Sequence, residues 1–430
     1  MSQAFTKLGI VTDVTVSNKD GPGVDSFSRA RISEPRFVFD AQFTYDLAPL
    51  LYEPIAANGG AGTATVAHDT TNRCALMTLN GVNTAASAYM QTFSFHRYQP
   101  GRSQLVFVTF NFVETKANVT KFAGYSDGVN GIELQQVGTT VQLKLYSATT
   151  NGDQTKAQAD WNVDPMTNGS GPSGFTLDLT KSQILVIDLQ ALYVGRVRVG
   201  FDIDGSIYWV HQFVHANRVV YPYIQNANRP IRCGMVSTGS VSGSTTMLFC
   251  CSSVVSEGGD ELAPYPFTQE TSVTAGSGTR THMLSIRPTL VYPSGSSIPN
   301  RAKFDLSGIE GLVTSGSNAV YWELCVGYWS TQPTTYISVN SAFSGVEYNI
   351  SGTGGTPSAV TGNPIVIASG YIGSGGGSSK TAASRTLLSR APLSLNQAAA
   401  IHNYGVLTLL ATGIGGTSPA RMALSWTETR

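Results

Sequence analysis

The sequence predicts an all-β protein, and three observations lead to this fold class. Charged residues make up only 13% of the 430 residues, about half of the usual quarter. The 45 glycines are spread along the chain without a collagen-like period, which is typical of short strands joined by tight turns. Apolar residues recur at every second position in segments such as Val141–Tyr146, which is the period of a half-buried strand.

Three parts can be distinguished along the chain. Residues 1–35 are polar and irregular, and we interpret them as an extended N-terminal arm. Residues 36–265 are expected to form a first β-sandwich domain, and residues 273–430 a second one. The stretch Pro266–Ser272 is interpreted as the connector between them. No repeat of roughly 20–50 residues is present, which argues against solenoids and propellers.

The expected strands are short segments rich in β-formers or in alternating apolar residues. In the first domain they are 36–43, 73–79, 89–95, 103–112, 121–126, 131–136, 140–146, 183–189, 196–203 and 206–213. In the second domain they are 281–287, 302–306, 320–328, 364–369 and 421–427. A short helix is expected over Asn396–His402.

The best-defined local structure is a hairpin around Asp204-Gly205. Asp-Gly favours the type I′ turn, because both central residues need a positive φ. Before the turn, Val197 and Val199 share one side of the strand with Phe201 and Ile203. After the turn, Tyr208 and Trp209 point to opposite sides. One of these two large rings is therefore expected to lie outside the core.

Charge and composition exclude several classes of function. Lys+Arg and Asp+Glu both number 27, and nucleic-acid binding usually needs a basic excess. No signal peptide is visible, and no window approaches the roughly 20 apolar residues of a membrane span. The five cysteines have no zinc-site spacing and are interpreted as free thiols. We therefore expect no metal, no cofactor, no nucleic acid and no membrane insertion.

The candidate catalytic residues have simpler explanations in strands and turns. His211 and His215 lie at the end of a strand, where residues four apart are roughly 13 Å from each other, too far to share an ion. Asp188, Asp202 and Asp204 are carboxylates of one expected sheet, and a pair at about 5–9 Å could hydrolyse a glycosidic bond. Asp204, however, is favoured by the turn itself. With no nucleophile motif present, we expect a protein that is not an enzyme.

Aromatic residues are the remaining candidates for binding. Five of them lie close in sequence to loops and to the hairpin, namely Trp161, Tyr208, Trp209, Tyr221 and Tyr223. Rings on the rim of a sandwich can stack on the apolar face of a pyranose, and they can equally fill a core or a contact with a neighbouring chain. These five residues are the candidate contacts to a glycan or to another subunit.

Several segments resemble a family of structural proteins found in tailed phages of aquatic bacteria. They are Phe27–Pro35 with Phe39-Asp40, Trp161–Asp164, Asn168–Asp178, Val194–Phe201 through His211 to Asn217, and Ala420–Glu428. The resemblance covers residues 27–260 well and the C-terminal third more loosely. It implies a concanavalin-like jelly-roll β-sandwich in the first domain, and it carries no catalytic residues.

These features together predict a non-enzymatic structural protein of a tailed bacteriophage virion. A place in the tail or fibre apparatus is expected, with contact to a host surface glycan, to other virion proteins and to copies of itself in a homo-oligomer such as a trimer. The first alternative is a capsid decoration or head-fibre protein. The second is a tailspike that cleaves glycans, although the β-helix repeat typical of such enzymes is absent.

Overall fold

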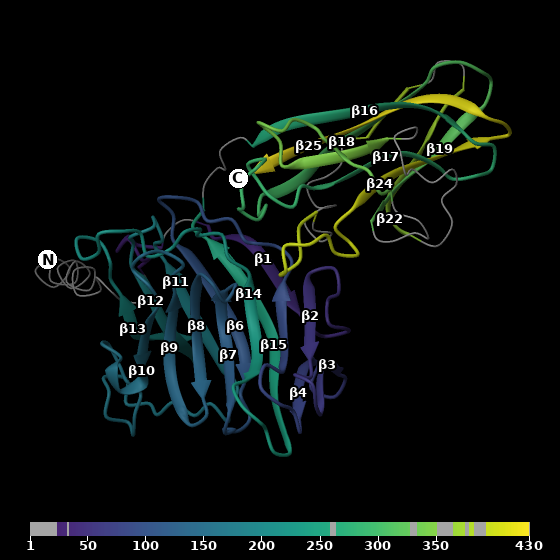
Figure 1. Cartoon of the computed structure of the whole chain (residues 1–430). Helices are drawn as coiled ribbons and strands as arrows, with labels where there is room; N and C mark the ends of the chain where they lie inside the picture. Colours follow the sequence, from purple (N-terminus) through teal and green to yellow (C-terminus); the bar gives the residue numbers. More distant parts are fainter. Residues whose placement is uncertain are drawn as a thin grey trace, which may run out of the picture. The chain divides into compact units, whose positions relative to one another are not determined.

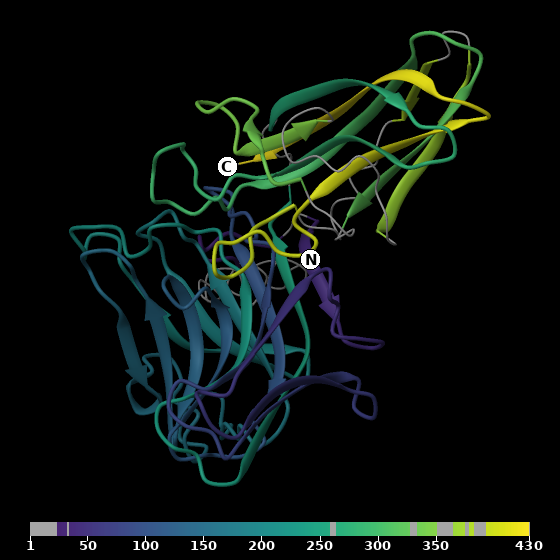
Figure 2. The same ribbon diagram turned by 45° about the vertical axis from the view of Figure 1, so that its right-hand side comes forward.

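The computed structural model describes residues 24–31, 34–258, 264–326, 333–350, 364–374, 378–381 and 393–429. In this part of the chain nearly all regular structure is β, and the one helix is a single 3₁₀ turn, Gln158–Asp160. The chain divides into two compact units, residues 1–92 with 96–261 and residues 93–95 with 262–430. Figures 1 and 2 show the strands of the first unit in purple to teal and those of the second in green to yellow.

The first unit consists of two antiparallel sheets. The order in the eight-stranded sheet is β13 (Ser206–Phe213), β12 (Val197–Ile203), β11 (Gln183–Leu189), β6 (Gln104–Asn111), β15 (Ser244–Ser256), β4 (Cys74–Asn80) and β3 (Thr63–Asp69), with β1 (Arg36–Gln42) also paired to β15. The order in the seven-stranded sheet is β10 (Gln154–Ala157), β9 (Thr140–Tyr146), β8 (Gly131–Val137), β7 (Val119–Ser126), β14 (Ile231–Ser237), β5 (Ser87–Thr92) and β2 (Tyr52–Ala57). In both sheets, several strands that lie side by side come from segments far apart in the sequence, as in a jelly roll.

One hydrophobic core lies between the two sheets. Alternate residues contribute to it, such as Ile132 and Leu134 of β8 and Val197 and Val199 of β12. Since successive side chains of a strand point to opposite sides, the residues between them form the outer face of each sheet. The expected all-β, jelly-roll-like fold is confirmed, and each sheet offers one outer face for function.

The predicted hairpin is confirmed in register and turn. Ile203 pairs with Ser206 around Asp204 (φ 53°) and Gly205 (φ 79°), as the type I′ turn requires. Tyr208 packs against the core, whereas Trp209 lies on the outer face of the eight-stranded sheet. One large ring is therefore outside the core, as expected.

The second unit is also a two-sheet sandwich. Its four-stranded sheet has the order β16 (Tyr265–Ala275), β25 (Ser418–Thr429), β18 (Lys303–Val313) and β23 (Ser378–Thr381). Its six-stranded sheet has the order β20 (Ile337–Ser338), β21 (Val346–Ile350), β17 (Thr281–Pro288), β24 (Leu407–Ile414), β19 (Ala319–Val326) and β22 (Ile365–Ile372). Trp322 and Trp426 are almost fully buried in the core between them.

Two local predictions are wrong. The expected connector Pro266–Ser272 lies inside β16, which pairs with β25 along its whole length. Phe267, Thr271 and Val273 alternate with exposed residues, as in an edge strand with one buried side. The expected helix over Asn396–His402 is a turn closed by the bridge between Leu395 and Ile401. The Asn396 amide side chain accepts from the Ala400 N–H, so local turn chemistry overrides the helical preference of the alanines.

Candidate functional site

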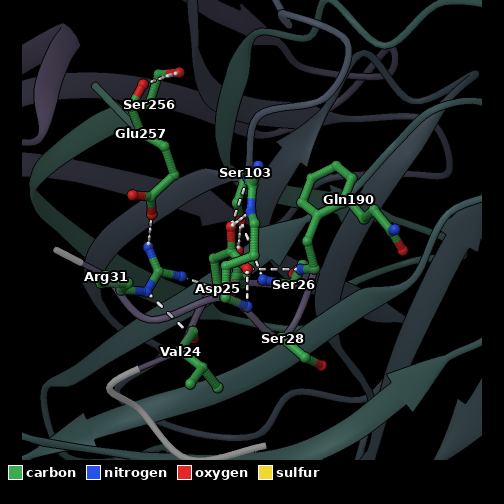
Figure 3. Close-up of polar contacts among 12 residues, drawn as sticks. Val24, Asp25, Ser26, Ser28, Arg31, Ser103, Gln190, Ser256 and Glu257 are labelled. Atoms are coloured by element: carbon green, nitrogen blue, oxygen red, sulfur yellow. Dashed lines mark hydrogen bonds and ion pairs between the residues drawn. The ribbon is translucent and has the colours of Figure 1, made fainter. Parts of the chain in front are cut away.

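Part of the outer face of the eight-stranded sheet, around β11 and β12, is covered by the chain itself. Residues Val24–Arg31, here called the N-terminal segment, form a small loop closed by the bridge between Val24 and Ala30. Figure 3 shows Asp25, Ser26 and Arg31 of this segment gathered near Ser103 and Glu257 of the sandwich. These residues belong to the expected N-terminal arm, and they lie on the chain's own first unit.

Asp188 of β11 is the centre of this contact. Its side chain is 0% exposed, and it accepts from Arg31 Nη2 at 2.7 Å, from Arg198 Nη2 at 2.5 Å and from the hydroxyl of Ser103. Arg31 also pairs with Glu257 at 2.6 Å. A buried carboxylate with two cationic partners is fully satisfied, so Asp188 holds the segment in place and is not available to a ligand.

Two further arginines attach the segment through its backbone. Arg198 Nη2 donates to the Val24 carbonyl at 2.8 Å, and Arg196 Nη2 donates to the Ser26 carbonyl at 3.0 Å. The Arg198 guanidinium also lies 4.4 Å from the ring centroid of Trp209. The outer face of this sheet is therefore used for an intramolecular contact.

The outer face of the seven-stranded sheet carries a different set of side chains. We call it the polar–aromatic face and define it by Tyr89, Gln91, Phe122, Glu133, Gln135, Gln142, Lys144, Tyr146 and Arg232. One register row runs across six strands, in the order Lys144, Glu133, Gly124, Arg232, Gln91 and Glu53. Figure 1 shows three of the strands that hold it, β9, β8 and β7, side by side.

Glu133 and Arg232 meet across β7 because the residue between them is Gly124. Arg232 Nη1 lies 3.4 Å from Glu133 Oε1, and the two side chains are 14% and 0% exposed. A Cβ atom on Gly124 would lie 2.2 Å from the carbonyl oxygen of Ile132. The position therefore requires glycine, and its missing side chain leaves the space through which Arg232 reaches Glu133.

The other carboxylate oxygen of Glu133 belongs to a chain of amide and hydroxyl groups. Gln135 Nε2 donates to Glu133 Oε2 at 2.9 Å and to the Tyr146 hydroxyl at 2.8 Å. Gln142 Nε2 in turn donates to Gln135 Oε1 at 2.9 Å. Burial and the negative charge of Glu133 raise the pKa of Tyr146 above its usual value, so its hydroxyl stays protonated.

Aromatic rings lie beside these polar groups. The Arg232 guanidinium lies 4.5 Å from the ring centroids of both Tyr89 and Phe122. Lys144 Nζ lies 4.3 Å from the ring centroid of Tyr146, and it pairs with Asp153 at 3.1 Å. Tyr89 and Phe122 are only 5% and 2% exposed, so their rings hold Arg232 in place, and the groups of this face that can reach a sugar are polar: Gln142, Lys144, Tyr146 and Arg232 are partly exposed.

The five aromatic residues singled out from the sequence do not form a common surface. Trp161 is 4% exposed and Tyr223 is 1% exposed within the core, so neither ring has a side free for a ligand. Trp209 packs under Arg198 on the covered face, and Tyr208 contacts Phe175 with a centroid distance of 5.1 Å. Tyr221 is 52% exposed, and its role in binding stays a prediction.

The carboxylates and histidines considered for catalysis are also separated. Asp202 lies four residues farther along β12 than Arg198, the partner of Asp188, which corresponds to about 13 Å along the strand. His211 accepts from the Asn162 N–H, whereas His215 contacts the Gly195 carbonyl and stacks on Tyr223. In the described ranges, no group of three or more His, Cys, Asp and Glu is arranged to hold a metal ion.

Sequence reasoning missed the polar–aromatic face. Glu133, Gln135, Lys144 and Tyr146 lie in strands that were expected, and the alternation of Val141–Tyr146 indicates their outward direction. No strand is predicted over Ile231–Ser237, however, where Arg232 lies between the two core residues Ile231 and Cys233. The pairing of β14 between β7 and β5 is what brings Arg232 to Glu133, and no local signal reveals it.

Comparisons with known proteins concern the fold. No protein-family model and no curated protein matches the sequence. Among solved structures, the catalytic domain of an endo-1,3-beta-glucanase (laminarinase) from Thermotoga petrophila is 11% identical with a TM-score of 0.34, covering 53% of this chain and 100% of that chain. A glycosyl hydrolase family protein from Mycobacterium fortuitum is 13% identical with a TM-score of 0.33, covering 51% and 99%. A beta-glucanase from Bacillus licheniformis is 12% identical with a TM-score of 0.30, covering 52% and 98%.

These matches correct one expectation from the sequence. The chain was expected not to be an enzyme, yet the solved structures that it resembles are those of glycan-cleaving enzymes. A β-sandwich of this kind therefore gives no reason to exclude catalysis, and the absence of sequence motifs was not sufficient evidence. In the described part of the chain, no helix has the length and apolarity to cross a membrane.

Proposed function

We propose that this chain is a virion protein of a tailed bacteriophage that binds a host-surface glycan through the polar–aromatic face. The virion assignment is supported by the resemblance of the segments between residues 27 and 260 to phage structural proteins. The glycan assignment is supported by the side chains of the face. Fold alone would not suffice for either, because one fold serves many functions.

The observation that carries the glycan proposal is the arrangement around Glu133. Its carboxylate is held between Arg232 and Gln135 on the outer face of a sheet, and Tyr146 and Gln142 extend the same network to partly exposed positions. This network is ordered before any ligand arrives. Pre-ordered donors and acceptors lower the entropic cost of binding a flexible saccharide.

A glycan array probed with the full chain tests this proposal. We expect binding to one or more polysaccharides, and we expect Glu133→Gln to weaken that binding at least tenfold. Asp202→Asn, on the other sheet, is the matched control and should bind as the wild type does. Equal binding by the Glu133 variant would contradict the assignment of this face, and the absence of any bound glycan would contradict the function.

The position on the virion needs a separate experiment. Tail or fibre attachment is the first expectation, and capsid decoration is its alternative. Labelling of intact particles with antibodies against the chain, followed by cryo-EM, distinguishes the two by the site of the label. Copies of the chain in contact with each other would appear in the same maps and would give the number of subunits. Particles without label would contradict the virion assignment itself.

Glycan cleavage is the second candidate function, and one specific observation favours it. A buried carboxylate and a tyrosine hydroxyl are bridged by the Gln135 amide, and both groups can transfer protons. The usual carboxylate pair of glycoside hydrolases is not formed with Glu53, which is four strands away from Glu133, or about 19 Å. Mass spectrometry of the bound polysaccharide after incubation tests cleavage. Shortened polysaccharides that the wild type produces and the Glu133→Gln variant does not would establish an enzyme. Polysaccharides of unchanged length would mean that the chain binds glycans without cleaving them.

A further inference from the structure

The second unit contains a cavity of about 340 Å³ beside one end of its six-stranded sheet. It is lined by the end of β17, by residues of the loop 289–294 that follows, by β20 and by the start of β21. Sites for small molecules have volumes of about 300–1,000 Å³, and this one equals about eleven water molecules at about 30 Å³ each. The cavity is therefore large enough for one sugar ring with its hydroxyl groups.

Two charged side chains lie together at the wall of this cavity. Arg287 and Glu347 are register partners on β17 and β21, and Ser338 of β20 continues the row. Arg287 Nε donates to Glu347 Oε1 at 2.6 Å, and the two side chains are 26% and 20% exposed. Among the described residues, this is the one hydrogen bond that either side chain makes. The terminal nitrogens of Arg287 and the second carboxylate oxygen of Glu347 are therefore available to a ligand in the cavity.

The walls of the cavity are held in place by hydrogen bonds of the chain. The Thr289 N–H and the Asn300 side-chain amide both donate to the Gly345 carbonyl, at 2.9 and 2.7 Å. The buried carboxylate of Glu428 accepts from the Ser344 hydroxyl at 2.6 Å and from the Gly345 N–H at 2.9 Å. These bonds tie the loop after β17 to the segment before β21, so the cavity is ordered before a ligand binds.

The lining of the cavity indicates the class of ligand. Arg287 and Glu347 neutralise each other, so the wall has no net charge that would attract an anion or a cation. A hydroxyl group both donates and accepts, and two hydroxyls on neighbouring ring carbons can bind the free carboxylate oxygen and the guanidinium together. Leu290, which is 52% exposed, and the partly exposed Val291 add apolar surface for the C–H groups of a sugar.

We infer that this cavity binds one neutral sugar unit, with Glu347 accepting from and Arg287 donating to adjacent hydroxyl groups. The site goes beyond the proposed function, because it belongs to the second unit and shares no residue with the polar–aromatic face. The Arg287 guanidinium lies 3.7 Å from the centroid of the Tyr336 ring, which fixes its plane. Its free nitrogens are therefore oriented before the sugar arrives.

The test is a titration of the full chain with single sugars, followed by saturation-transfer difference NMR. The probes are D-glucose, D-galactose and D-mannose, with D-glucuronic acid and D-glucosamine as charged counterparts. We expect at least one neutral hexose to bind, and both charged sugars to bind at least fivefold more weakly than that hexose. Preference for a charged sugar would overturn the neutral ligand class.

Two pairs of variants locate the binding. Glu347→Gln should weaken it about tenfold, because a charge-assisted hydrogen bond is lost. Its matched control is Glu323→Gln, since Glu323 also pairs with an arginine, Arg280 at 2.7 Å, but does not line the cavity. Ser294→Trp should fill the cavity from an exposed loop position and abolish binding, whereas Ser297→Trp, exposed in the same loop but outside the lining, should leave it unchanged.

The outcomes separate this site from the polar–aromatic face. Unchanged affinity of Glu347→Gln or Ser294→Trp, in a variant that keeps the melting temperature of its control, would overturn the site. A signal that is lost in Glu133→Gln and kept in Glu347→Gln would belong to the polar–aromatic face and would also overturn it. If no neutral hexose binds while the glycan array still shows binding, the cavity site is wrong and the proposed function stands.

Discussion

The two outer faces of the first unit are built by the same kind of sheet, yet they differ in what satisfies their charges. On the eight-stranded sheet, Asp188 is paired with Arg198 of the sheet and with Arg31 of the N-terminal segment. On the seven-stranded sheet, Glu133 is paired with Arg232 and Gln135 of the sheet itself. A distant segment closes over the first carboxylate, whereas the network of the second continues within its own sheet to the partly exposed Gln142 and Tyr146.

A buried carboxylate on a sheet is therefore not by itself a functional site. Asp188 and Glu133 are both 0% exposed. What differs is where the partners of the carboxylate come from: a distant segment closes the network of Asp188, whereas the network of Glu133 leads through Gln135 to side chains that solvent can reach.

The largest effect is expected for Asp188→Asn. Removing this charge leaves Arg198, which is 0% exposed, without its counter-charge, and the expected loss in free energy of unfolding of the first unit is about 3–5 kcal/mol. Hydrogen exchange of β11 and β12 in increasing urea measures it. Asp202→Asn, a partly exposed carboxylate of the same sheet, should change stability by less than about 0.5 kcal/mol. Equal effects of the two substitutions would show that Asp188 is not the centre of the covered face.

A smaller loss is expected for Arg31→Ala. Arg31 is 21% exposed and makes charged hydrogen bonds to Asp188 and Glu257, so the N-terminal segment should lose about 2 kcal/mol of its attachment. Faster hydrogen exchange and proteolysis over residues 24–31 would report this loss. Arg29→Ala is the control, because Arg29 is 54% exposed and pairs only within the segment, with Asp25. If the segment stays protected in the Arg31 variant, the backbone contacts of Arg196 and Arg198 hold it alone.

Glu133→Gln should affect stability less than Asp188→Asn does. Gln retains an acceptor oxygen for Gln135, and Arg232 is partly exposed and stacked on two rings. We expect a loss of about 1–2 kcal/mol in the free energy of unfolding, since charge-assisted hydrogen bonds weaken while their geometry is kept, measured in the same urea series. A loss as large as that of the Asp188 variant would mean that both carboxylates serve only the fold.

The smallest effect is expected from pH. Burial and the charge of Glu133 raise the pKa of Tyr146 above 10.0, so its ionisation cannot change binding between about pH 6 and 9. Because the unfolded chain releases this proton first, stability should fall as the pH rises above about 10. Absorbance of tyrosinate, compared between the wild type and Tyr146→Phe, measures the transition. Titration of Tyr146 near pH 10 in the folded protein would show an open, solvated hydroxyl instead.

Much of the local structure could be predicted from the sequence because it depends on neighbours along the chain. The hairpin at Asp204-Gly205 follows from a turn that needs positive φ at both residues. The strands Gln183–Leu189 and Ser206–Phe213 match their expected bounds, since alternation marks a half-buried strand. The predictions over Pro266–Ser272 and Asn396–His402 were wrong because their local propensities are weak. Pairing at the edge of a sheet decided the first segment, and hydrogen bonds of a turn decided the second.

The two outer faces, in contrast, depend on pairings between distant segments. Three properties follow from the amino-acid sequence without knowledge of the pairings: the all-β fold, the alternation that separates inner from outer residues, and the low charge of the chain. Only the tertiary structure placed Arg31 on Asp188 across 157 residues and Arg232 beside Glu133 across 99 residues. The physical reason is that a strand's own pattern fixes which side faces outward, whereas the identity of its neighbours is fixed by the closing of the whole sandwich around one core.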